Sequence, residues 1–124
     1  MIARAASSLT GSQILDDLAE LVGEEAAWAL AAEFMGERVY IPKDPAVEPR
    51  IAAAIGEDLA RILCDALWRT ILPFPTRVVV ERRVQRLAEE GLPKREIARR
   101  VKISQSRVFA ILARLRDSDQ LQLL

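Results

Sequence analysis

The sequence predicts a mainly α-helical protein, with an N-terminal helical dimerisation domain that carries short β-strands and a C-terminal helix-turn-helix. Apolar residues recur at i, i+3, i+4 and i+7, the spacing of amphipathic helices. Two short β-favouring runs each end at a proline, which confines a strand or ends it. The C-terminal part then contains two helical segments joined by a short turn. Of the 124 residues, 51% are hydrophobic and 29% charged, a composition typical of folded domains.

The N-terminal domain, expected over residues 1–75, has the pattern of a duplication. A shift of 33 residues (from 23 to 56) places Gly23-Glu24 on Gly56-Glu57. Each copy predicts a helix, a second helix and a short extended segment, at residues 38–42 in the first copy and 70–75 in the second. The apolar positions that coincide are Ala27, Leu30, Ala31 and Phe34 in the first copy and Ala60, Leu63, Cys64 and Leu67 in the second.

Helix boundaries in this domain are indicated by single residues. Ser12 is a candidate N-cap for the first helix. Gly23 and Gly56 stand where one helix should end and the next begin. Residues 42–49 form the loop between the copies, and Pro49 is suited to the first turn of the following helix.

A unit of this size buries little surface, and two short strands leave edges that invite pairing with another chain. We therefore expect a homodimer in which the helices and strands pack across a two-fold axis. The alternative is a self-contained pair of helical hairpins in a monomer. The residues expected at the dimer interface are Leu30, Phe34, Tyr40, Ile41, Leu63 and Leu67.

The C-terminal domain, expected over residues 76–124, predicts helices over about 77–90, 94–101 and 104–116. The last two have the spacing of a helix-turn-helix, in which the residue at the crossing must be small, and Ala98 occupies that position. Ser104 is a candidate N-cap for the third helix. Lys102 stands where the turn often has glycine, and a left-handed conformation there costs on the order of 1 kcal/mol unless the turn differs slightly.

The two parts of the chain carry opposite net charges. Residues 1–75 contain 6 Lys+Arg and 12 Asp+Glu, a net charge of −6, whereas residues 76–124 contain 12 and 6, a net charge of +6. A basic half indicates a nucleic-acid partner, although two ordinary solvated surfaces are the alternative.

The outer face of the third helix is the predicted reading surface for double-stranded DNA. Glutamine can pair with adenine, arginine with guanine, and an aromatic ring can contact the thymine methyl group. The residues expected at base edges are Gln105, Ser106, Arg107 and Phe109, the last of which equally fits the flank of the core. Lys94, Arg95, Lys102 and Arg114 are expected at phosphates, where they supply affinity and register. Arg99 and Arg100 fit solvated surface charges equally well.

Other classes of function are disfavoured. The chain has no histidine, no glycine-rich phosphate loop and no nucleophile–base pair, so we do not expect an enzyme, a cofactor or a metal site. The paired carboxylates at 24–25 and 57–58 fit first-turn residues that face helix dipoles. No apolar run is long enough to cross a membrane, residues 1–11 do not resemble a secretory signal, and the single cysteine fits a cytoplasmic location.

Several motifs together resemble the Mor transcription activator family, the middle-operon regulators of Mu-like phages and prophages. The motifs are Val22-Gly23-Glu24-Glu25, Val39-Tyr40-Ile41-Pro42-Lys43, Ile55-Gly56-Glu57-Asp58, Arg95-Glu96-Ile97-Ala98-Arg99, Val101, Ile103-Ser104 and Arg107-Val108-Phe109. The resemblance covers about residues 16–116. The chain departs from the family pattern at Lys102, and at Trp68-Arg69-Thr70, which replaces a glycine-rich turn.

The resemblance implies a homodimer that binds a dyad-symmetric promoter element and activates transcription by contacting host RNA polymerase. It also implies that residues 105–107 begin the recognition helix and that residues 40–42 form the extended segment after the first dimerisation helix. The leading hypothesis is therefore a sequence-specific transcription activator of a phage or prophage. The alternatives are a helical protein–protein adaptor that docks an acidic partner, and a repressor or recombination accessory with the same DNA contacts.

Overall fold

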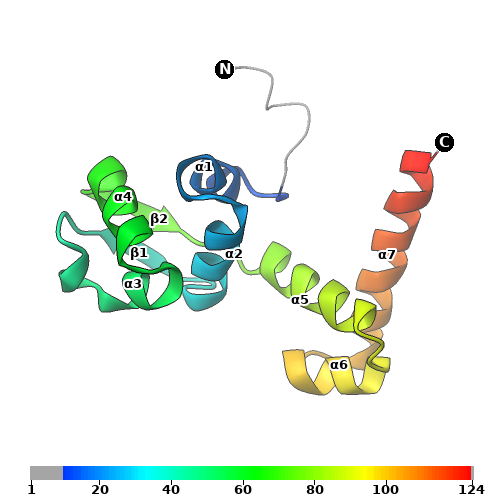
Figure 1. Cartoon of the computed structure of the whole chain (residues 1–124). Coiled ribbons are helices and arrows are strands. Elements are labelled where there is room, and N and C mark those ends of the chain that lie inside the picture. The colour runs from blue at the N-terminus through cyan, green and yellow to red at the C-terminus, as the bar shows by residue number, and fades with distance from the viewer. Residues whose placement is uncertain (1–9, 124) are drawn as a thin grey trace. The chain divides into compact units, whose positions relative to one another are not determined.

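The computed structural model describes residues 10–123, with side chains up to residue 117 (Figure 1). The chain is mainly helical and contains a two-stranded antiparallel sheet, which confirms the coarse fold class. It divides into two compact units, residues 1–79 and 80–124, whereas the sequence placed the division after residue 75. Residues 1–9, most of the segment expected not to be a secretory signal, lie outside the described residues.

The first unit repeats one pattern of helix, glycine, helix and strand. Gly23 (φ 99°, ψ 155°) and Gly56 (φ 89°, ψ 161°) have nearly the same backbone conformation, and each joins two helices as predicted. The elements are α1 (Gln13–Val22), α2 (Glu24–Glu33), β1 (Arg38–Ile41), a 3-10 helix η2 (Pro45–Val47), α3 (Pro49–Ile55), α4 (Glu57–Leu67) and β2 (Thr70–Pro73). The two copies thus differ mainly in the length of their first helix.

The second unit contains three helices, of which α5 begins within the first unit. They are α5 (Arg77–Glu89), α6 (Lys94–Val101) and α7 (Gln105–Leu123). The last helix extends seven residues past the expected end at residue 116, because residues 117–123 contain neither proline nor glycine to stop it.

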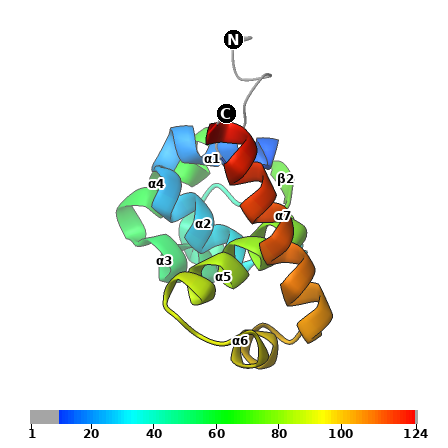
Figure 2. The same cartoon turned by 90° about the vertical axis from the view of Figure 1, so that its right-hand side faces the viewer.

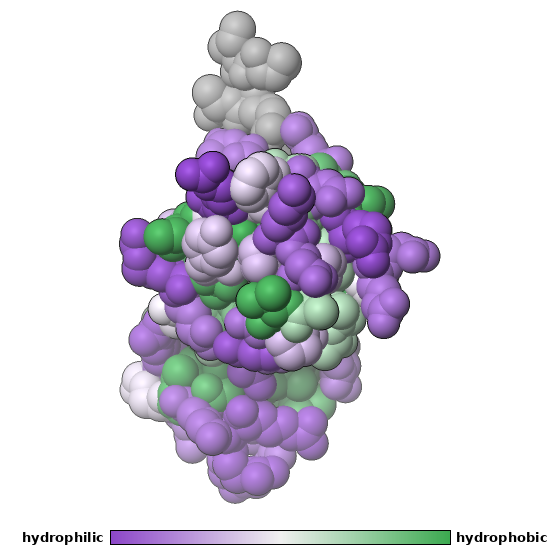
Figure 3. Space-filling model, turned by 90° about the vertical axis from the view of Figure 1, so that its left-hand side faces the viewer, coloured by the Kyte–Doolittle hydropathy of each residue, from purple (hydrophilic) through white to green (hydrophobic). Residues whose placement is uncertain are grey.

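The helices of the first unit cover one face of the sheet. In the register Val39↔Leu72 and Tyr40↔Ile71, the first pair is buried among the helices and the second points outward. Tyr40 is 55% exposed and Ile71 is 52% exposed. On the face shown in Figure 3 the surface is mainly hydrophilic and is interrupted by separate hydrophobic patches. The sheet therefore has one buried face and one accessible apolar pair.

Four residues expected at the dimer interface belong instead to the core of the single chain. Leu30, Phe34 and Ile41 are each 1% exposed, and Leu63 is 0% exposed. The ring of Phe34 stacks on Phe74 with the centroids 5.5 Å apart. The apolar stripes of the four helices pack on one another and on the sheet, so these side chains are not available to a second chain. Of the expected set, Tyr40 is exposed and Leu67 is half-buried.

Ser12 occupies the N-cap position of α1 as predicted, but its side chain forms no capping hydrogen bond. The buried Asp16 carboxylate instead accepts hydrogen bonds from the Thr10 backbone N–H (2.9 Å) and hydroxyl (2.8 Å). The Thr10 hydroxyl oxygen also accepts from the Ser12 N–H at 3.2 Å. The start of α1 is thus fixed by a residue two positions before the expected cap.

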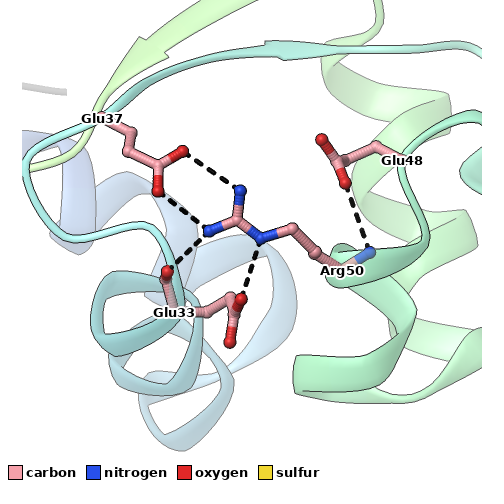
Figure 4. A network of polar contacts seen from close by, with 4 residues as sticks. All are labelled: Glu33, Glu37, Glu48 and Arg50. Carbon is pink, nitrogen blue, oxygen red and sulfur yellow. Dashed lines mark hydrogen bonds and ion pairs between the residues drawn. The ribbon is translucent and has the colours of Figure 1, made fainter.

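Arg50, on the first turn of α3, connects the two copies (Figure 4). Its guanidinium donates to both carboxylate oxygens of Glu37 at 2.9 and 3.2 Å, and to the carboxylate (2.8 Å) and backbone carbonyl (2.9 Å) of Glu33. The same group lies over the Phe34 ring, 4.4 Å from its centroid. This contact holds the turn between α2 and β1 against α3, and the Arg50 hydrogen bonds keep the pKa of Glu37 below its ordinary value.

A variant of Arg50 tests this connection through its pH dependence. A carboxylate with a lowered pKa stabilises the fold above its unfolded pKa, about 4.3 for glutamate, and this contribution is lost as the pH falls further. In Arg50→Gln we expect lower stability at neutral pH and a smaller loss of stability below about pH 4.3 than in the wild type. Urea unfolding followed by tryptophan fluorescence measures this, because both tryptophans lie in the first unit. Arg61→Gln, on the exposed surface of α4, is the matched control, and equal acid sensitivity of all three proteins would contradict the prediction.

Candidate nucleic-acid interface

The second unit is built on a small apolar core to which all three helices contribute. Val84 from α5, Ile97 from α6 and Val108 from α7 are fully buried. The remaining buried members are Val80, Ala98, Val101 and Ile111, and Leu112 and Leu115 are half-buried. The apolar residues that recur at helical spacing in α6 and α7 thus face the interior of the unit.

A three-residue turn joins α6 to α7. Lys102 adopts the left-handed conformation (φ 66°, ψ 46°), and the carbonyl of Ala98 accepts hydrogen bonds from the N–H groups of Lys102 (2.8 Å) and Ile103 (3.1 Å). The Ser104 hydroxyl then accepts from the Arg107 N–H at 3.1 Å, which is the predicted capping bond of α7. The two helix axes cross steeply, since α6 is seen end-on in Figure 2 while α7 runs across the view.

The start of α7 presents the predicted reading residues to solvent. Gln105, Ser106 and Arg107 are all exposed. Phe109 is 60% exposed, so the alternative in which it flanks the core is wrong. Ala110 is exposed beside it, and its small side chain leaves the helix surface open to close approach. These residues form one accessible edge over the first two turns of the helix.

The cations predicted at phosphates divide into two groups. Among the described residues, Arg95 and Lys102 are exposed and form no ion pair, and the Lys94 ammonium lies 4.6 Å from the centroid of the Phe109 ring. Arg114 instead forms a salt bridge with Glu81, which ties α7 to α5. Its guanidinium therefore has a structural partner within the unit that the sequence did not indicate.

Glu96 engages the two arginines whose role the sequence left open. Its carboxylate accepts hydrogen bonds from Arg99 and, at 3.0 Å, from Arg100, on the exposed surface of α6. Both interactions keep the pKa of Glu96 below its ordinary value. The i,i+3 and i,i+4 spacings predict such pairs, so the sequence contained this signal. The contact of Lys94 with Phe109 joins two helices and has no comparable signal.

Cys64 is buried on the apolar side of α4, and burial raises the pKa of its thiol. No group of three or more His, Cys, Asp or Glu residues that could hold a metal ion occurs among the described residues. Within the same residues, no helix combines the length and apolar character that a membrane span requires.

Comparisons with known proteins do not place the chain in a family. No family model matches the sequence, and no curated protein and no solved structure is significantly similar to it.

The left-handed turn predicts the effect of a glycine at position 102. Glycine adopts this conformation without the steric cost of about 1–2 kcal/mol that a side chain incurs, but it also raises the entropy of the unfolded chain. We expect Lys102→Gly to stabilise the second unit by about 0.5–1 kcal/mol, and Lys102→Ala, which removes the same charge, to give no such gain. Amide hydrogen exchange in α6 and α7 measures the difference, and equal protection in the two variants would contradict the left-handed conformation.

Proposed function

We propose that the protein is a sequence-specific DNA-binding regulator of transcription in which α6, the turn at 102–104 and α7 act as a helix-turn-helix. The observation that carries the proposal is the accessible edge at the start of α7, where the exposed Gln105, Ser106 and Arg107 follow the exposed Lys102, which has no acidic partner among the described residues. Polar side chains in the first turns of such a helix can read base edges in the major groove. Arg95 and Lys102 stand at opposite ends of α6 and suit phosphate contacts.

The distribution of charge supports duplex DNA as the partner. The basic half carries a net charge of +6, and its exposed cations Arg95 and Lys102 form no ion pair within the described part of the chain. The phosphate backbone of DNA attracts such cations without regard to sequence, and the α7 edge then provides selectivity. An enzyme is not part of this proposal.

A homodimer completes the proposal, because a symmetric pair of reading helices fits a dyad-symmetric site. Support for a dimer comes from the outward pair Tyr40 and Ile71, which leaves an apolar sheet face accessible. This face replaces the buried residues first expected at the interface. By the resemblance to the Mor family, we further propose activation at a phage or prophage promoter through host RNA polymerase, in the cytoplasm.

A competing function is that of an adaptor whose basic face docks an acidic protein. The exposed Phe109 favours an adaptor, because aromatic residues are enriched at interfaces between proteins. Chromatography of the expressed protein with and without nuclease treatment separates the two, since only a DNA-binding protein should lose co-eluting nucleic acid. A repressor would share every DNA contact described here, and reporter transcription distinguishes it from an activator.

The proposed function predicts distinct effects for two arginines in a salt titration of DNA binding. Log K should fall linearly with log salt concentration. Arg107→Ala should weaken specific binding by about 1–3 kcal/mol relative to nonspecific binding. Arg95→Gln should weaken both alike and reduce the slope by about one. Arg83→Gln, an exposed cation on α5, is the control, and a flat salt response or an unchanged specificity ratio in Arg107→Ala would contradict the assignment.

A further inference from the structure

Phe109 is distinguished from the rest of the second unit by its exposure. Among the described side chains of residues 80–117 it is the only large hydrophobic one that is predominantly exposed. Two of its neighbours one turn away on the helix, Ser106 and Ala113, are small and leave much of the ring uncovered. A single exposed apolar residue is common on protein surfaces, so exposure alone assigns no role.

The second observation is the position of Lys94. It is half-buried as the first residue of α6, and its ammonium lies 4.6 Å from the Phe109 centroid, within the range of a cation–π contact. The lysine comes from the other helix of the pair, so the contact fixes the ring relative to both helices. One face of the ring is thereby occupied by the cation, while the rest of the ring remains accessible to a ligand.

We propose that Phe109 recognises the C5 methyl group of a thymine in the major groove, and that Lys94 is a positioning residue that holds the ring for this contact. The inference rests on the proposed DNA-binding function. It adds that the site distinguishes thymine from bases that lack the C5 methyl group. The thymine methyl is the apolar group that base pairs present in the major groove, and an apolar side chain is the partner it requires. The ammonium over one ring face disfavours stacking of an extruded base between Phe109 and α6.

The test uses the full-length protein and DNA that lacks only the methyl group. A binding site is first selected from random duplex DNA, and each thymine is then replaced by deoxyuridine. For the wild type we expect one thymine in each half-site at which the replacement raises Kd about fourfold, the value of one buried methyl-sized group. In Phe109→Ala the ratio of the uracil to the thymine Kd at that position should be close to one. Val47→Ala, which truncates an exposed apolar residue of the first unit, should keep the wild-type ratio.

The role of Lys94 is tested by the same ratio and not by affinity alone. Lys94→Met removes the charge but keeps a long apolar chain, and it should lower the discrimination between thymine and uracil. Lys94→Arg can retain the cation–π contact and should preserve the discrimination. A lysine that only bound phosphate would change the Kd of the thymine and uracil sites by the same factor, and this result would overturn its positioning role.

The outcomes also separate this inference from the function on which it rests. If no sequence is enriched from the random DNA, the proposed function and the methyl contact are both overturned. If a sequence is enriched but no deoxyuridine replacement distinguishes the wild type from Phe109→Ala, only the methyl contact is overturned. A uniform loss of affinity in Phe109→Ala at every site would likewise assign the ring a role other than methyl recognition.

Discussion

The arrangement of α6 and α7 depends on the backbone of Lys102. Its left-handed conformation lets two successive N–H groups reach the carbonyl of Ala98, which ends α6 abruptly. The chain then reaches Ser104, whose hydroxyl accepts a hydrogen bond from the Arg107 N–H and caps α7, which begins at Gln105 directly after the turn. Without this conformation the apolar sides of α6 and α7 would not meet over Ala98, and the edge formed by residues 105–107 would point elsewhere. A residue in a strained backbone conformation thus sets the direction of α7.

The first unit shows how a repeated sequence limits where a second chain can bind. The apolar stripes of its helices are buried in the core of the same chain, where Leu30 and Leu63 occupy equivalent places in the two copies. Arg50 then connects the turn between α2 and β1 of the first copy to the start of the second copy through Glu33 and Glu37. Since the interior is complete, any interface must use residues that point away from it. The outward face of the sheet, with Tyr40 opposite Ile71, meets that condition.

Helices, strands and their boundaries could be predicted largely from local sequence signals. The 3.6-residue periodicity located the helices, and Gly23, Gly56 and Pro49 marked ends that the structure confirms. The departures from a glycine at Arg69 and Lys102 were also visible in the sequence, and both residues have positive φ, 70° and 66°. What periodicity could not decide is whether a buried stripe faces the same chain or another one, because the spacing is identical in both cases. Four of the six residues predicted at the dimer interface are wrong for this reason, because they lie in the core of the single chain.

The candidate site was predictable in its exposed edge but not in its electrostatics. Helical spacing assigned Gln105, Ser106 and Arg107 to the outer face. Which partner a cation contacts, however, can depend on segments that are distant in sequence. Glu81 on α5 engages Arg114 on α7, while Lys94 on α6 reaches Phe109. Glu96 acts over a shorter range and engages Arg99 and Arg100, which lie in the last turn of α6. Among the described cations of α6 and its turn that have no acidic partner, Lys94 contacts the Phe109 ring, whereas Arg95 and Lys102 lie near opposite ends of the helix. Under the proposed DNA-binding function, this arrangement suits two separated phosphate contacts better than one continuous basic stripe, because charge at two points fixes orientation on a duplex as well as affinity.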